Sequence, residues 1–172
     1  FLFLGLSAGT GQGQAAALFY AVSYSLMSVG AFAVVILMAR RGFEADRIED
    51  FRGLNQSHPW FAFIVLLLMG SLAGFPPLFG FWAKLAVIQA AVQGDMIWLA
   101  LVAAVFAVVG AFYYLRVIKV MYFDDAAEDT VHVASVDTQL RWVLSANGLA
   151  MLVLGLFWSP LIDWCLRAVG TH

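Results

Sequence analysis

The sequence has few charged residues, one cysteine and few histidines. Only 12% of its 172 residues are charged, against roughly 25% in soluble domains, while 63% are hydrophobic and the mean hydropathy is +0.90. The single Cys165 excludes an intrachain disulfide and a cysteine-cluster metal site, and the three scattered histidines offer no metal-ligand spacing. We therefore expect an integral membrane protein without a cofactor, metal or redox centre of its own.

The first residues lack the features of a translation start or a signal peptide. The chain opens at Phe1 in FLFLGLSAG, without a methionine, a positive region or a small-residue cleavage site. About residues 1–8 are apolar and precede a glycine-rich stretch, so we interpret them as the tail of a helix. We expect the chain to be the C-terminal part of a longer polytopic protein.

Long apolar segments alternate with short charged clusters. A helix needs about 20 apolar residues to cross a bilayer, and four segments reach that length. We predict an all-α fold, a polytopic transmembrane helix bundle that forms a single membrane domain over residues 1–172. The predicted spans cover about residues 14–39, 59–93, 96–123 and 140–166.

Residues 59–93 are too long for one straight crossing. A helix of this length would extend about 50 Å, whereas the hydrocarbon core is about 30 Å thick. Pro76 and Pro77 lack a backbone donor and disfavour helix before them, which predicts a break near residues 74–79. Carbonyls freed at that depth must face protein or a water-filled cavity, as in discontinuous transporter helices. The alternative is a tight hairpin between two short spans.

The positions of lysine and arginine distinguish these two topologies, because basic residues concentrate in cytoplasmic loops. A single broken crossing leaves seven basic residues on one side and only Arg167 on the other, whereas a hairpin leaves five and three. The count favours the single broken crossing. We predict that the mixed-charge loop 40–58 and the acidic loop before the last span are cytoplasmic, with residues 171–172 on the opposite side.

Lys84 is the main candidate functional residue, because it lies in an apolar segment about two turns beyond the predicted break. No acid within four residues can pair with it along the helix. A lysine near the bilayer centre costs about 2.5–3.5 kcal/mol, so it is expected to face the protein interior and to serve a function. Loss of water penalises the charged form, which would let Lys84 exchange a proton near neutral pH. The alternative is a lysine that snorkels to the interface.

Several other polar or helix-breaking residues are candidates for supporting roles. The span at 14–39 carries a polar track of tyrosines and serines in its first half, although its small residues can also serve close helix packing. In the span at 96–123, Arg116 either snorkels together with Lys119 or faces the broken helix as a fixed positive charge. The supporting candidates are Tyr24, Ser25, Ser28, Pro76, Pro77, Gly80 and Arg116.

Three blocks of the sequence resemble subunit N of the proton-pumping NADH:quinone oxidoreductases (respiratory complex I), an antiporter-like membrane subunit family. The blocks are FYAVSYSLMSVGAFAVV, IEDFRGL, and SLAGFPPLFGFWAKL with YYLRVIKVMYF, which together span about residues 18–123. The related subunit M has a glutamate in place of Lys84, and the related subunit L has an extra histidine and lysine that residues 14–39 lack. One departure is Ser28, where many relatives have asparagine.

This resemblance implies a proton-translocating subunit in which Lys84 is the proton relay of the second of two inverted five-helix repeats. Other subunits would hold FMN, iron–sulfur clusters and quinone, so this chain would transfer no electrons. The implied partners are other complex I membrane subunits, including neighbouring antiporter-like ones, and the lipid bilayer, with no nucleic acid. The implied location is the bacterial inner membrane or an organellar energy-transducing membrane. Two other functions remain open: a subunit of a cation/proton antiporter, and a structural subunit whose lysine pairs with a neighbouring chain.

Overall fold

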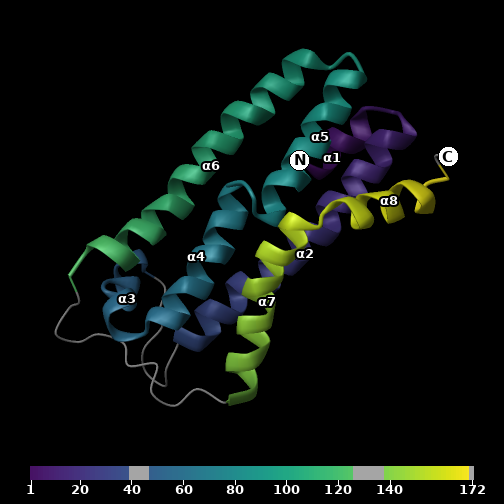
Figure 1. Ribbon diagram of the computed structural model, residues 1–172. Helices are drawn as coiled ribbons and strands as arrows, with labels where there is room; N and C mark the ends of the chain where they lie inside the picture. Colours follow the sequence, from purple (N-terminus) through teal and green to yellow (C-terminus); the bar gives the residue numbers. More distant parts are fainter. Residues whose placement is uncertain (39–46, 126–137, 171–172) are drawn as a thin grey trace.

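The computed structural model describes residues 1–38, 47–125 and 138–170, and all regular structure in these ranges is helical (Figure 1). The predicted all-α bundle with one discontinuous helix is confirmed. By length and composition, α2, α6 and α7 can each cross a membrane alone. The helices are α1 (Leu2–Ser7), α2 (Gly11–Met38), the 3-10 helix η1 (Ile48–Phe51), α3 (Leu54–Ser57), α4 (Pro59–Ala73), α5 (Phe79–Gln93), α6 (Ile97–Phe123), α7 (Thr138–Leu156) and α8 (Ser159–Ala168).

Helices α4 and α5 run in the same direction and together cross the bundle once (Figure 1). Each has 15 residues and is therefore about 22 Å long, too short to span a core of about 30 Å alone. At the far end of α5, a side chain on Gly94 would lie 3.2 Å from the carbonyl oxygen of Ala8, beside the turn that leads into α2. The structure thus has a single broken crossing and no hairpin in this segment.

Gly74 ends α4 by adopting a left-handed conformation with φ of 90°, which glycine accepts more readily than other residues. The N–H groups of Gly74 and Phe75 donate to carbonyls three and five residues earlier, both at 3.0 Å, in a Schellman motif. Pro76 and Pro77 follow and cannot donate the hydrogen bonds that would continue the helix. The glycine therefore stops α4, and the prolines prevent its continuation.

The end of the predicted exposed loop at 40–58 is helical and packed against the bundle. Phe51 in η1 and Leu54 in α3 are buried, and the N–H of Gly53 donates to the carbonyl of Val120 at 3.4 Å. Because these apolar side chains have a surface on α6 to cover, this part of the segment folds onto that helix. The beginning of α4 and the end of α6 thus lie at the same end of the bundle.

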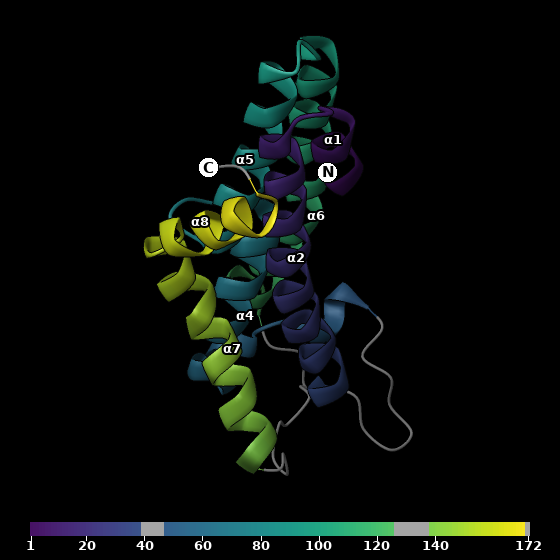
Figure 2. The same ribbon diagram turned by 90° about the vertical axis from the view of Figure 1, so that its right-hand side faces the viewer.

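The predicted continuous span at 140–166 is wrong, because α7 ends at Leu156 and α8 turns sharply away from its direction (Figures 1 and 2). Pro160 lies in the first turn of α8, where its missing N–H is tolerated at a helix start but not within a helix. The indole of Trp158 stacks on Trp82 of α5, with ring centroids 4.7 Å apart. This stacking holds the beginning of α8 against the broken crossing.

Gly155 allows α7 to contact the break itself. A Cβ atom at this position would overlap the carbonyl oxygen of Pro77 and would lie 2.8 Å from the backbone nitrogen of Phe79. The contact involves backbone atoms, which cannot move aside as a flexible side chain can. Helix α7 therefore supports the segment between α4 and α5.

We predict that Gly155→Ala destabilises the full-length protein by about 1–3 kcal/mol, the usual cost of overpacking a close contact. Gly110→Ala is the matched control, because a Cβ atom at Gly110 meets nothing within 4 Å. That control should keep or raise stability, since alanine favours helix over glycine by about 1 kcal/mol. Thermal denaturation of both purified variants, followed by circular dichroism, makes the comparison. Equal midpoints would contradict the contact.

Candidate functional site

The ammonium group of Lys84 lies at the end of α4. Its Nζ donates to the carbonyl oxygen of Leu72 at 2.8 Å and to that of Ala73 at 3.1 Å. In a continuous helix these two carbonyls would accept from the N–H groups of residues 76 and 77, but both of those residues are proline. The prolines thus leave free the two acceptors that Lys84 uses.

Within residues 1–38, 47–125 and 138–170, the charge of Lys84 is balanced by backbone dipoles and not by a carboxylate. Among the described residues, the ion pairs are Arg52–Asp124 and Arg116–Glu49, and neither includes Lys84. The C-terminal end of α4 carries the negative end of its helix dipole, which favours a cation there. The half-buried lysine is therefore held by backbone carbonyls, which carry no formal charge.

Two cavities meet at Lys84. One, of about 340 Å³, follows the break between α5 and α6 and is lined by Gly74, Phe75 and Pro76 together with alanines of α6. The other, of about 210 Å³, lies between α2 and α6 and is lined by tyrosines from both helices. Lys84 lines both cavities, the first nearly apolar and the second with phenol groups.

The phenol groups of the second cavity come from Tyr20 and Tyr24 on α2 and Tyr114 on α6. Tyr20 and Tyr24 stack at 5.8 Å between ring centroids, as residues four apart on one helix face can do. A phenol hydroxyl both donates and accepts, so three of them can hold water beside an ammonium group. Tyr24 is a supporting candidate from the sequence and Tyr20 belongs to the same polar track, whereas Tyr114 joins them only through the packing of α6.

Two serines proposed as supporting residues do not line either cavity. Ser25 is exposed, and its hydroxyl donates to the carbonyl of Ala21 in its own helix at 2.8 Å. Ser28 is half-buried on the same helix. Of the three proposed α2 residues, the structure brings only Tyr24 to Lys84.

Arg116 points away from the break, which contradicts the hypothesis that it faces the broken helix. Its guanidinium lies 3.8 Å from the carboxylate of Glu49 in η1, and both side chains are about half exposed. Because residues two apart on a helix lie about 200° around its axis, Arg116 is on the side opposite Tyr114, which faces the cavity. Arg116 therefore fits the snorkelling interpretation.

Ser71 and Gly80 join the two half-helices beside Lys84. The buried hydroxyl of Ser71 accepts the N–H of Gly80 at 2.9 Å and donates to the sulfur of Met27 at 3.1 Å. This N–H belongs to the first turn of α5 and has no partner within its own helix. A Cβ atom at Gly80 would overlap the carbonyl oxygen of Ser71, so glycine is needed for this approach.

Comparison with known proteins places the chain among membrane subunits. Residues 1–112 match the family described as "NADH:quinone oxidoreductase/Mrp antiporter, TM". The chain is 56% identical to NADH-quinone oxidoreductase subunit N of Xanthomonas euvesicatoria pv. vesicatoria, over 98% of this chain and 34% of that protein. It is 54% identical to subunit N of Thioalkalivibrio sulfidiphilus, over 99% of this chain and 35% of that protein. The chain thus spans about a third of the length of these curated relatives.

Solved structures share the same fold. One chain of respiratory complex I from Thermus thermophilus with bound aureothin superimposes with a TM-score of 0.77 at 30% identity, over 94% of this chain and 36% of that chain. One chain of the Mrp complex from Dietzia sp. DQ12-45-1b superimposes with a TM-score of 0.80 at 20% identity, over 98% of this chain and 39% of that chain. The second likeness concerns the fold alone.

We predict that Ser71→Ala lowers the free energy of unfolding by about 1–3 kcal/mol, because it leaves the buried N–H of Gly80 without an acceptor. Hydrogen–deuterium exchange of the full-length protein should show faster exchange in the first turn of α5. Ser25→Ala is the control, since that hydroxyl is exposed and bonds only within its own helix, and it should leave exchange at α5 unchanged. Unaltered protection in Ser71→Ala would show that the bond contributes nothing to holding the half-helices together.

Proposed function

Because this chain belongs to the NADH:quinone oxidoreductase/Mrp antiporter transmembrane family, we propose that it is the part of a complex I subunit N that carries a proton relay at Lys84. The whole protein would couple quinone reduction by the complex to proton transport across the membrane. One observation carries the proposal: the Lys84 ammonium is bonded to two carbonyls at a helix break and faces two cavities. Such an arrangement is typical of ion sites at discontinuous helices.

In this mechanism Lys84 receives a proton from water held by the tyrosines and releases it towards the cavity along the break. The tyrosine-lined cavity of about 210 Å³ has room for several waters, each of which occupies about 30 Å³ in the liquid. The protonated side chain is stabilised by the carbonyls of Leu72 and Ala73 and by the negative end of the α4 dipole. With no carboxylate bonded to it in the described part of the chain, Lys84 can become neutral without leaving an unpaired acid.

Electron transfer in this proposal belongs to other subunits, which would hold FMN, iron–sulfur clusters and quinone. Within the described residues, no group of three or more His, Cys, Asp or Glu side chains could bind a metal ion. The proposed partners are the neighbouring antiporter-like subunits and the bilayer. Helix α6 offers a surface for them, because large apolar side chains such as Trp98, Leu101 and Phe112 are exposed along it. The bacterial relatives support a location in the bacterial inner membrane.

A cation/proton antiporter of the same architecture is the second candidate, since the Mrp complex shares this fold. The higher identity to subunit N favours the quinone-dependent complex. Affinity purification of the tagged full-length protein separates the two functions. Recovery of flavin and iron–sulfur protein with it supports the first, and their reproducible absence from an intact, active assembly overturns it.

We predict that Lys84→Ala lowers proton pumping and coupled quinone reductase activity by about tenfold or more, because a positioned proton-transfer group is removed. Lys84→Arg should also impair both activities, since arginine stays protonated. Lys119→Ala, which removes an exposed lysine near the end of α6, is the control and should keep both activities. Pumping is measured in vesicles after assembly has been verified by native gel electrophoresis. Full pumping by the assembled Lys84→Ala complex would refute a proton relay at Lys84. Wild-type turnover by Lys84→Arg would show that Lys84 acts only as a fixed charge.

We predict that Arg116→Gln keeps nearly full pumping, because its exposed ion pair with Glu49 contributes only about 0–1 kcal/mol. The amount of protein in the membrane should fall if the charge serves topology. Quantifying membrane abundance and activity per assembled complex separates these effects. Lower pumping per assembled complex at normal membrane abundance would instead show that Arg116 takes part in the proton relay.

A further inference from the structure

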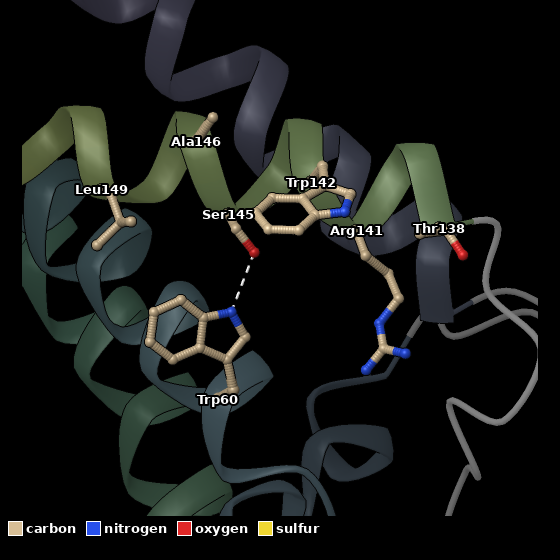
Figure 3. A pocket seen from close by; sticks show the side chains of 7 residues that line it. All are labelled: Trp60, Thr138, Arg141, Trp142, Ser145, Ala146 and Leu149. Atoms are coloured by element: carbon tan, nitrogen blue, oxygen red, sulfur yellow. Dashed lines mark hydrogen bonds between the residues drawn. The ribbon is translucent and has the colours of Figure 1, made fainter.

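A groove lies between the beginnings of α4 and α7, away from Lys84 and at the end of the bundle where α6 finishes. Its cavity has a volume of about 510 Å³, within the range of about 300–1,000 Å³ found for ligand pockets. Figure 3 shows the side chains that line it, with one from α4 and the others from α7. They include Trp60, Arg141, Trp142, Ser145, Ala146 and Leu149.

The groove has a polar end and an apolar end. The indole N–H of Trp60 donates to the hydroxyl of Ser145 at 3.0 Å and connects its two walls. A smaller cavity of about 190 Å³ is also lined by Trp60, Ser145 and Arg141, and it adds Ser57 and His58. Beyond Ser145, the groove continues along Ala146 and Leu149. Arg141 therefore lines both cavities, of which the smaller one combines polar side chains with apolar ones such as Phe61 and Ile64.

Arg141 provides the charge that selects an occupant. It is exposed and takes part in neither of the two ion pairs that the described ranges contain. Figure 3 shows its guanidinium projecting to the side of α7 on which Trp60 lies. A guanidinium matches the geometry of a phosphate and can bind it through two parallel hydrogen bonds.

The groove lies at the level of the membrane where lipid headgroups are found. Trp60 follows the first residue of α4, and Arg141 and Trp142 lie in the first two turns of α7. Tryptophan is enriched at the headgroup level of membrane proteins, and basic residues at span ends reach the same level. An occupant with a phosphate beside these residues and a hydrocarbon chain towards Leu149 would match both ends of the groove.

We propose that this groove binds an anionic phospholipid, with the phosphate on Arg141 and an acyl chain along Ala146 and Leu149. A zwitterionic lipid also has a phosphate, but its amine adds a positive charge that Arg141 would repel. The proposal does not depend on the proton relay.

The test uses the full-length protein in its purified complex, reconstituted into nanodiscs of phosphatidylcholine with a photo-cross-linkable phosphatidylglycerol. Peptide mass spectrometry maps the labelled residues. We expect label on the segments containing Trp60 and Leu149, and Arg141→Gln should reduce it about fivefold, the effect of one basic residue at a charged membrane surface. Arg167→Gln removes an exposed arginine on α8 and, as the matched control, should leave the label unchanged.

A second variant and a second lipid keep the test decisive. Ala146→Trp fills the groove without removing a charge, so it should reduce labelling by phosphatidylglycerol and by a cross-linkable phosphatidylcholine, whereas Arg141→Gln should affect only the former. Equal labelling by the two lipids, unchanged in Arg141→Gln, would overturn the proposal. So would the absence of lipid label from the segments containing Trp60 and Leu149, because lipid would then not occupy the groove.

Discussion

The hydrogen bonds between Lys84 and the carbonyls of Leu72 and Ala73 reduce two energetic costs at once, that of unpaired carbonyls and that of a charged lysine within the membrane. A helix that stops within a membrane leaves carbonyls without partners, and each unsatisfied group costs several kcal/mol. A lysine at the same depth has a charge that needs acceptors. Because Pro76 and Pro77 remove the usual donors, the carbonyls and the ammonium group satisfy each other. The break and the lysine are therefore one structural feature.

The packing around this feature depends on residues with little or no side chain. Gly80 lets the first turn of α5 approach Ser71, and Gly155 lets α7 contact the backbone at Pro77. A Cβ atom on Gly74 would lie 3.2 Å from the Lys84 side chain. Small residues allow such close approach in membranes, where packing replaces the hydrophobic effect as the force between helices. Helices α4, α5 and α7 can thus approach one another closely beside the break.

The break and Lys84 could be predicted from the sequence because they follow from local rules: proline has no donor, and an intramembrane charge is costly. Features that depend on which faces of two helices contact each other could not be predicted from the sequence. Tyr114 reaches the cavity only because α6 packs with one particular face inward, and Arg116 turns to a glutamate in η1, a segment interpreted as loop. The division between α7 and α8 does not follow from the apolar length of residues 140–166, in which Pro160 is the local signal for the start of a second helix. Spacing within one helix carries no information about these contacts.

The geometry also makes the lysine sensitive to small movements. Its backbone belongs to α5, whereas its acceptors belong to α4. The two hydrogen bonds, at 2.8 and 3.1 Å, therefore connect the half-helices. Hydrogen bonds of this kind are usually about 2.7–3.2 Å long. A displacement of α5 from α4 would therefore lengthen these bonds or require the lysine side chain to change its conformation. Helix α7 contacts the connecting segment at Pro77 through Gly155, so it packs against the same segment that separates the lysine from its acceptors.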